Sequence, residues 1–526
     1  MIGVCRKPVK ASQGLDDAHL MLDLPDFTPL KVTQISRTPT RAAYDNLEHV
    51  LIVVPKSAAS VSLRKLPQSR HLEQLHKRTV KQALDVVATR FGNARGTGVT
   101  LARFDASTPF GALSWARTTI AECLEDKPAT LGIVSAALDP AAAELATSSL
   151  IAAANAASFE LPRLKSSAER STRLRTLQLL EPEPRREDLA VQRAAALGNN
   201  VARWFTALPP NELTAAAYRD AIETLVKGRR IRYRFLNEAR LRALGAGAFL
   251  AVSRGNATRD AGIVHLSYRP TRSKAEALAL VGKGVIFDTG GTNLKPFKGM
   301  LDMHTDMQGS AVALGGLLAL AELEAPYPVD AWLAVTENRL SARAYKPQDV
   351  VHAVNGTTIQ VIHTDAEGRM VLADTLALAA RERPAAMIDY ATLTGACVSA
   401  LTERYSGVFA NRASANELLV EAGAASGERV WPFPMDEDFD EALKSEIADV
   451  KQCSPESDGD HILAARFLSR FVPREIPWVH VDLSAGQHKG GLGHVPTEIT
   501  GFGVRLTLEL LHRGGISPRD LFGKCA

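Results

Sequence analysis

Residues 278–296 read Leu-Ala-Leu-Val-Gly-Lys-Gly-Val-Ile-Phe-Asp-Thr-Gly-Gly-Thr-Asn-Leu-Lys-Pro. The apolar run before Gly282 predicts a buried strand, and the glycines allow the backbone to come close to a ligand or a metal. The charged residues of the stretch are Lys283, Asp288 and Lys295. A phosphate-binding loop is excluded, because the Gly-Lys-Ser/Thr of a Walker sequence and the third glycine of a dinucleotide fingerprint are both missing.

A second charged stretch, residues 362–374, reads Ile-His-Thr-Asp-Ala-Glu-Gly-Arg-Met-Val-Leu-Ala-Asp. Asp365, Glu367 and Arg369 occupy alternate positions, so on an extended backbone their side chains would point to the same face and converge just before a helix. The alternative is structural. Thr364 and Glu367 fit a capping box, which would simply start the helix that the following apolar run predicts. This stretch alone leaves both interpretations open.

Asp306 adds a third acidic position, just before a small and apolar stretch that predicts a buried helix. A lone Asp there would usually be an N-cap. Counting charges favours a shared site, because four carboxylates beside Lys283 cannot all stay ionised in a partly buried pocket without compensation. The four are Asp288, Asp306, Asp365 and Glu367.

Two divalent cations would neutralise this cluster. A two-metal centre suits amide hydrolysis, because it polarises the carbonyl and activates a water molecule. Lys283 can be a ligand only as the neutral amine, so the metals must depress its pKa from the ordinary value of about 10.4. Oxygen ligands with one nitrogen favour Mn, Mg, Zn or Co.

Five segments carry a resemblance to a known family. They are residues 281–296, 303–307 (Met-His-Thr-Asp-Met), 336–338 (Thr-Glu-Asn), 364–369 (Thr-Asp-Ala-Glu-Gly-Arg) and 391–396 (Ala-Thr-Leu-Thr-Gly-Ala). In order and separation they resemble the leucyl aminopeptidase family, the cytosol aminopeptidases, over most of residues 195–505. Several motifs in register are far more specific than one short motif. The resemblance implies a metal-dependent aminopeptidase that releases N-terminal amino acids from peptides, with a leucine-like preference.

The resemblance also implies two divalent metal ions per subunit, with Mn²⁺ or Zn²⁺ favoured. One ion would be held by Lys283, Asp288, Asp306 and Glu367. The other would be held by Asp288, Asp365 and Glu367, so that two carboxylates bridge the pair.

Roles in catalysis and substrate binding follow from the same resemblance. Lys295 would polarise the scissile carbonyl and stabilise the oxyanion. Arg369 would bind a bicarbonate ion that relays protons as general base. Met303 and Thr392 would line the pocket for the N-terminal side chain, and the Leu393 carbonyl would position the substrate.

Two histidines depart from the family pattern. The family usually carries Lys or Arg at the position of His304 and Asn at that of His363. Neither position is a metal ligand in the family, so we expect catalysis to survive. His304 either affects peptide selectivity or is merely packed or solvated. On an extended backbone His304 would project to the same face as Asp306, and nearby cations would keep it neutral at pH 7.

The pattern of apolar runs predicts an α/β fold, with a smaller N-terminal α/β domain joined to a larger C-terminal α/β catalytic domain that has a mixed, mostly parallel sheet. Strands are expected at 49–54, 99–104 and 130–135, with helices near 70–90, 112–125 and 140–157. Further strands are expected at 262–267, 276–281, 328–335, 357–362 and 385–390. The predicted domains are 1–160, the N-terminal α/β domain; 161–194, a charged linking helix; and 195–526, the dimetal peptidase domain.

Composition agrees with a multi-domain enzyme, since 526 residues exceed what one core usually supports. No run approaches the roughly 18 apolar residues of a membrane span, and the N-terminus lacks the apolar core of a signal peptide. The five cysteines, without metal-type spacing, suit reduced thiols. We therefore expect a cytoplasmic protein without membrane contact.

The partners expected are peptide substrates and, from the resemblance, further copies of the chain in a homohexamer. A basic cluster keeps nucleic-acid binding as a secondary hypothesis, although a solvated helix face explains it more simply because acidic residues are interleaved. The cluster is Arg163, Lys165, Arg170, Arg173 and Arg175. The alternative function is that of a catalytically weak family member with a DNA-binding or structural role.

Overall fold

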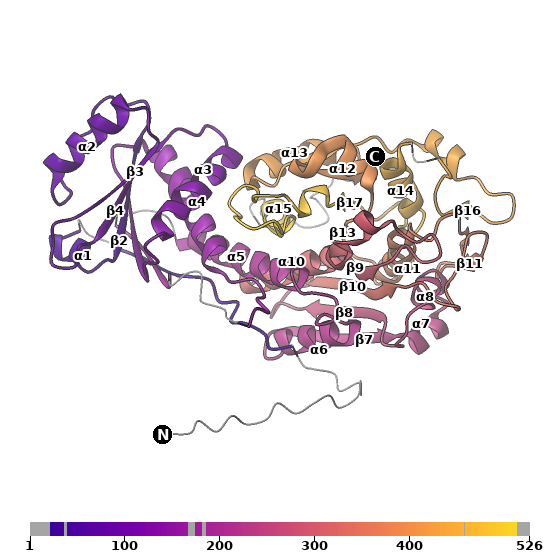
Figure 1. Cartoon of the computed structure of the whole chain (residues 1–526). Coiled ribbons are helices and arrows are strands. Elements are labelled where there is room, and N and C mark those ends of the chain that lie inside the picture. Colours follow the sequence, from indigo (N-terminus) through magenta and orange to yellow (C-terminus); the bar gives the residue numbers. More distant parts are fainter. Residues whose placement is uncertain (1–21, 36–38, 167–173, 181–185, 457, 513–526) are drawn as a thin grey trace, which may run out of the picture.

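The computed structural model describes residues 22–35, 39–166, 174–180, 186–456 and 458–512. The N-terminal part of the chain forms a six-stranded sheet, at the left in Figure 1, and the rest forms an eight-stranded sheet, at the right, with helices between the two sheets. The long helix α5 (Arg186–Thr206) runs from the first part to the second. The α/β fold class is therefore confirmed.

The six-stranded sheet has the order β1-β6-β5-β2-β4-β3, and only β3 is antiparallel to its neighbour. Its strands are β1 (Lys31–Gln34), β2 (His49–Pro55), β3 (Val86–Arg90), β4 (Gly98–Phe104), β5 (Thr130–Ser135) and β6 (Thr176–Leu179). The helices of this part are α1 (Arg41–Asp45), α2 (Ser69–Lys81), α3 (Pro109–Leu124) and α4 (Pro140–Ser158). The three strands predicted here are confirmed, as are the helices near 112–125 and 140–157.

Two helix predictions in this part are correct only in part. The helix expected near 70–90 ends at Lys81, and β3 follows it with alternating burial that suits a sheet. The segment 161–194, expected to be a linking helix, joins helix α5 only from Arg186 and contains the strand β6, in which Leu177 and Leu179 are buried while their neighbours are less buried. This period of two fits a strand, and β6 pairs with both β1 and β5. The basic residues Arg170 and Arg173 lie outside the described residues.

The eight-stranded sheet has the order β15-β14-β17-β13-β9-β10-β8-β7. Strands β17, β13, β9 and β10 are parallel to one another, whereas β7, β8 and β14 run antiparallel to a neighbour, so the predicted mixed, mostly parallel sheet is confirmed. Its strands are β7 (Ile231–Asn237), β8 (Gly262–Tyr268), β9 (Leu278–Asp288), β10 (Val329–Asn338), β13 (Ala386–Ala391), β14 (Ser406–Ala410), β15 (Val430–Pro432) and β17 (Trp478–Asp482).

The strand expected at 357–362 belongs elsewhere. It forms a small three-stranded sheet, composed of β11 (Val350–His352), β12 (Thr358–Gln360) and β16 (Val450–Lys451).

Helices cover both faces of the eight-stranded sheet, and each face has its own apolar core. The first core includes residues of α5, α6 (Ala215–Val226), α10 (Gln308–Glu322), α13 (Ala415–Ser426) and α15 (Val504–Leu511). The second includes residues of α7 (Glu238–Leu244), α8 (Gly247–Ser253), α11 (Glu367–Arg381) and α14 (Asp460–Ser469). The short helices α9 (Phe297–Met300) and α12 (Gly395–Leu401) follow the ends of β9 and β13.

This layering brings the carboxyl ends of β9, β10, β13 and β17 to one edge of the sheet, which is where open α/β sheets bind ligands. Within the described part of the chain, none of the helices has the length and apolar character needed to cross a bilayer.

Candidate metal centre and its surroundings

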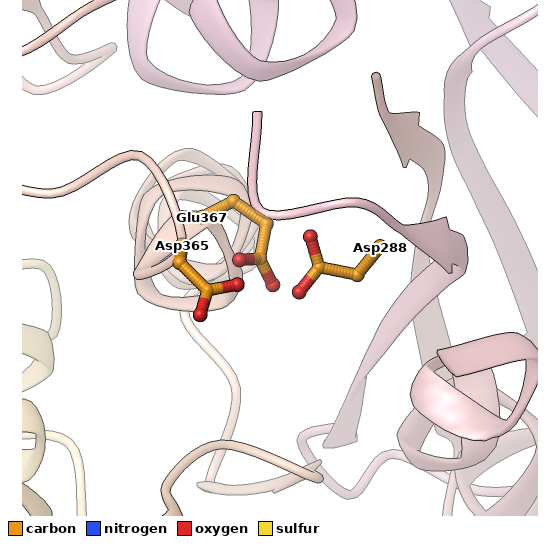
Figure 2. A group of neighbouring side chains, drawn as sticks. All are labelled: Asp288, Asp365 and Glu367. Carbon is orange, nitrogen blue, oxygen red and sulfur yellow. The ribbon is translucent and has the colours of Figure 1, made fainter. Parts of the chain in front are cut away.

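Three carboxylates meet at this edge of the sheet. Asp288 is the last residue of β9, Asp365 lies in the loop before α11, and Glu367 is the first residue of α11. Figure 2 shows the three carboxyl groups pointing toward one another, with one oxygen of each lying within 4.8 Å of the others. The predicted convergence of Asp365 and Glu367 is therefore confirmed, with Asp288 as the third member.

Lys283 lies beneath this group, in the interior of β9. Its Nζ is 2.7 Å from Asp306 Oδ1 and 2.9 Å from Glu367 Oε1, and it donates to the Thr392 carbonyl at 2.9 Å. The lysine is only 3% exposed. Gly368 leaves room for this lysine, because a Cβ at that position would lie 2.7 Å from Lys283 Cε and the lysine would have to shift.

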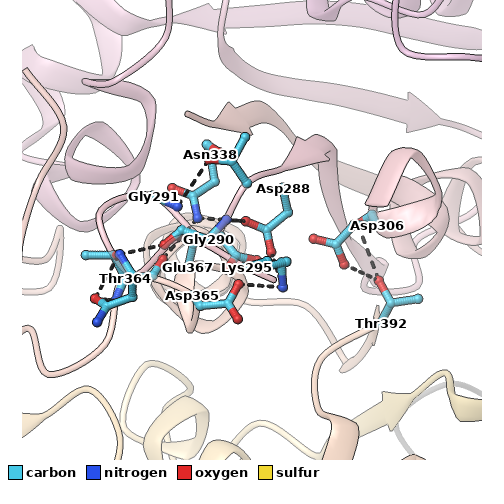
Figure 3. Close-up of polar contacts among 12 residues, drawn as sticks. Asp288, Gly290, Gly291, Lys295, Asp306, Asn338, Thr364, Asp365, Glu367 and Thr392 are labelled. Atoms are coloured by element: carbon cyan, nitrogen blue, oxygen red, sulfur yellow. Dashed lines mark hydrogen bonds and ion pairs between the residues drawn. The ribbon is translucent and has the colours of Figure 1, made fainter. Parts of the chain in front are cut away.

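Lys295 reaches the same group from the loop after β9. Its ammonium lies 2.9 Å from Asp288 Oδ2 and also contacts Asp365 (Figure 3). The loop turns sharply at Gly290, whose φ of +82° suits glycine. Asn338, at the end of the neighbouring strand β10, donates to Asp288 Oδ1 at 2.8 Å and so fixes that carboxylate.

The two capping alternatives are wrong. Helix α11 has Ala366 as its N-cap residue, without a capping side chain, and Thr364 instead donates to the Gly290 carbonyl at 2.6 Å. Asp306 does not cap α10, whose N-cap is Met307. Its Oδ1 accepts from Thr392 Oγ1 at 2.7 Å as well as from Lys283.

The electrostatics of the centre show too much negative charge for its surroundings. Burial, together with nearby carboxylates, raises the pKa of Asp306 to about 6, of Asp365 to about 7 and of Glu367 to about 8. Although burial opposes it, the ammonium groups of Lys295 and Lys283 hold the pKa of Asp288 below its ordinary value. The two lysines therefore compensate only part of the charge of four carboxylates.

The residues fit a bound cation. Asp306 Oδ2 and Glu367 Oε2 are buried and have no hydrogen-bond partner among the described residues. Buried carboxylate oxygens without partners are costly, and divalent cations take oxygen ligands of this kind. The carboxylate oxygens with the Lys283 nitrogen form a donor set that a divalent cation could take.

The centre opens into a cavity of about 420 Å³, here called the first cavity, which is lined by Lys283, Asp288, Lys295, Asp306, Asp365 and Glu367 together with Met303, Thr392 and Leu393. The sequence predicted each of these as a site residue, and the structure brings them together. The Leu393 amide donates to Asp482 Oδ1 at 3.1 Å, which fixes the loop after β13.

Arg369 does not share the face of Asp365 and Glu367. The extended backbone assumed for this stretch is wrong, because α11 begins at Glu367 and each helical residue turns by about 100°. Arg369 instead pairs with Asp460 and lines a second cavity of about 830 Å³. Lys295, Asp365 and Asp460 also line this second cavity, which adjoins the first.

The two histidines lie outside the cluster of carboxylates. His304 is in the 3₁₀ helix Met303–Met307, so the extended backbone expected to align it with Asp306 is absent, and it is not among the residues lining the first cavity. Burial lowers the pKa of His304. His363 lines the second cavity, and its Nδ1 accepts from the Asp365 amide at 3.3 Å.

Three polar residues that hold the site were not predicted from the sequence. They differ in how far the surrounding sequence could have identified them. Asn338 lies in the Thr-Glu-Asn segment, and its position at a strand end next to Asp288 is a usable signal. Asp482 likewise ends a parallel strand, β17. Asp460 comes from a segment far along the chain, and nothing local to it indicates a contact with Arg369.

The protein is an α/β protein with a candidate metal site. This site is an acidic centre with two lysines, and it lies at the carboxyl edge of a mixed sheet that has helices on both faces. Residues 200–508 match the model of the cytosol aminopeptidase family, catalytic domain, and the chain belongs to that family. The predicted membership in this family of peptidases is thus confirmed.

Individual relatives agree with this assignment. A probable cytosol aminopeptidase of Syntrophotalea carbinolica is 41% identical over 327 residues, which span 62% of this chain and 65% of the relative. One from Geobacter sp. (strain M21) is 38% identical over 364 residues, or 68% of this chain and 73% of the relative. A solved mutant of tomato leucine aminopeptidase superimposes with a TM-score of 0.82 at 28% identity, covering 94% of this chain and 98% of that one.

The raised pKa values predict how metal binding depends on pH. Between about pH 4 and pH 8 the metal-free native state binds protons at Asp306, Asp365 and Glu367 that the unfolded chain has released, so its stability falls as pH rises. Metal binding displaces these protons and therefore strengthens with pH. The increase in melting temperature caused by Mn²⁺ should grow from about pH 6 to about pH 8 in a thermal-shift titration. An increase that stays constant over this range would contradict the assignment of these carboxylates as ligands.

Proposed function

We propose that this chain is a metal-dependent aminopeptidase that releases N-terminal amino acids, with a leucine-like preference, from peptides. The observation that carries the proposal is the meeting of Asp288, Asp365 and Glu367 beside Lys283, with buried oxygens left unpartnered. Membership in the cytosol aminopeptidase family supports the same activity.

The proposed cofactors are two divalent cations, Mn²⁺ or Zn²⁺. One would be held by Lys283, Asp288, Asp306 and Glu367, and the other by Asp288, Asp365 and Glu367. When bound, the cations would polarise the scissile carbonyl and lower the pKa of the attacking water. Lys283 would enter the ligand set by giving up the proton that Asp306 and Glu367 now stabilise.

Lys295 is proposed as the group that stabilises the oxyanion. Its ammonium lies at the boundary between the two cavities, beside Asp288 and Asp365, where the carbonyl of a bound peptide would develop negative charge. If Asp288 and Asp365 held cations, they would attract Lys295 less strongly, and its ammonium would be available to the substrate.

The first cavity is proposed to hold the N-terminal residue of the peptide. Met303 supplies an apolar wall, Thr392 lies at the base beside Asp306, and the loop of Leu393 is fixed by Asp482. A volume of about 420 Å³ accommodates a side chain of the size of leucine.

The remaining proposals rest on the family. They are a homohexameric assembly and a cytoplasmic location. An N-terminal domain (1–160) and a peptidase domain (195–526) are likewise proposed, and the separation of the two large sheets in the sequence supports the two units. The intervening residues 161–194 include β6, which belongs to the first sheet, and the beginning of α5.

Turnover of a leucine chromogenic amide tests the function directly. The protein loaded with Mn²⁺ should hydrolyse it, and a strong chelator should abolish activity and lower the melting temperature, because the carboxylates depend on cations for neutralisation. Mn²⁺, Co²⁺ or Zn²⁺ should restore both. The variant Glu367→Gln, which has nearly the same shape but one negative charge fewer, should bind metal more weakly than the unaltered chain. Activity in a preparation shown to be metal-free by elemental analysis would refute the two-metal proposal, and an inactive Mn²⁺-loaded protein would favour a non-catalytic role.

Replacement of Lys295 separates binding from chemistry. Lys295→Ala should lower kcat by about a hundred- to a thousandfold, the range typical for loss of one oxyanion-stabilising group. Metal content should remain near two per chain, because the variant removes a cation that competes for Asp288 and Asp365. Lys298→Ala is the matched control, since Lys298 is exposed in the short helix α9 that follows the loop of Lys295. A rise in KM alone would assign Lys295 to ground-state binding instead.

A further inference from the structure

A buried arginine lies beside the candidate metal centre and carries its own counterion. Arg369 is two residues after Glu367 in α11, and its side chain is 2% exposed. Its Nη2 donates to both oxygens of Asp460, at 2.9 Å and 2.7 Å. Among the residues that the structure describes, Asp460 is the one carboxylate paired with this guanidinium.

The other nitrogens of the guanidinium are weakly satisfied. Nη1 makes a long contact of 3.4 Å to the Gln452 carbonyl, and Nε is buried without a partner among the described residues. Although burial opposes the charge, Asp460 holds the pKa of Arg369 above its ordinary value. Asp460 is therefore the carboxylate that contacts this buried guanidinium directly.

Asp460 is placed at the wall of the second cavity. It is the first residue of α14, which packs beside α11, and a negative charge is favoured at a helix N-terminus (Figure 1). Its side chain is 28% exposed and that of Arg369 is 2% exposed, so both residues line the cavity and the carboxylate is the more accessible member of the pair. Lys295 and Asp365 line the same cavity, which places the ion pair next to the proposed reaction site.

An arginine in this position without a paired side chain would bind a dissolved anion, because its planar guanidinium matches small carboxylates. The resemblance implies bicarbonate at Arg369, but here both oxygens of Asp460 occupy Nη2. We propose that Asp460 is a built-in anion, which fills the anion position at Arg369 and makes this centre independent of bicarbonate and other small dissolved carboxylates.

In this proposal, which rests on the proposed aminopeptidase function, Asp460 is a positioning residue. It neutralises Arg369 and so fixes the first turn of α11, from which Glu367 projects into the metal centre. Its removal should open a site for a carboxylate of the size of formate. Loss of a residue that orients a metal ligand typically costs about 10- to 100-fold in activity.

The test compares anion binding by Asp460→Gly and by the unaltered chain, both metal-free. Melting temperature is measured against sodium formate and sodium bicarbonate, with sodium chloride holding the ionic strength constant. The variant should be stabilised along a saturating curve, whereas the unaltered chain should not respond. Asp458→Asn is the matched control, because Asp458 is an exposed carboxylate of the same cavity and the residue that pairs with Arg369 is Asp460. This control should not respond either.

Activity gives the second readout. With Mn²⁺ bound, kcat of Asp460→Gly on the leucine amide should be about 10- to 100-fold below that of the unaltered chain and should recover with formate over the same concentration range as the melting temperature. If Asp460→Gly does not fold, Asp460→Ala also removes the carboxylate from Arg369 Nη2 and serves for both measurements.

The outcomes separate this inference from the proposed function. An unaltered chain stabilised by formate as strongly as the variant, or a variant that does not respond, would overturn the role of Asp460. An unaltered chain that is inactive with Mn²⁺ would overturn the aminopeptidase function, while the melting measurements would still decide whether Asp460 fills the anion position.

Discussion

The repulsion among four carboxylates at one edge of the sheet is the constraint on which the rest of the site depends. Asp288, Asp306, Asp365 and Glu367 are drawn together by the fold, and most are buried. The free energy of taking several such charges out of water is large, of the order of several kcal/mol for each ion, unless they are paired. Lys283 and Lys295 supply part of the compensation, and the raised pKa values show that it is incomplete.

The fold maintains this arrangement through parallel strands that end at the same place. Strands β9, β10, β13 and β17 deliver Asp288, Asn338, the loop of Leu393 and Asp482 to one edge, and the start of α11 adds Asp365 and Glu367. Close packing then fixes the geometry. Gly368 leaves room for Lys283, and Asn338 holds Asp288 by a hydrogen bond. A site of this kind depends on the whole sheet and not on one loop.

Much of this could be predicted from the sequence, because motif spacing and charge counting identify the same residues. Lys283, Asp288 and Lys295 follow from a strand and its glycine loop, and the structure places all of them around one cavity.

The predictions that were wrong concern local geometry. Arg369 was expected on the same face as Glu367 because the extended backbone was assumed to continue past Glu367, whereas helix α11 starts there. The same assumption misplaced His304, which lies in a 3₁₀ helix. The strand β6 was missed because its four residues carry too short an alternation to stand out in a polar segment. The pair of Arg369 with Asp460 joins residues 91 apart in the chain, and such tertiary contacts leave no local pattern.

The central claim is that these carboxylates with Lys283 hold two cations, and the most direct measurement is anomalous diffraction from crystals grown with Mn²⁺. The account predicts two peaks, roughly 3.5–4 Å apart, between Asp288, Asp365 and Glu367, with one of them also contacting Asp306 and Lys283. It further predicts that the Lys295 ammonium withdraws from Asp288. A single peak, or peaks elsewhere with Lys295 still joining Asp288 to Asp365, would contradict it.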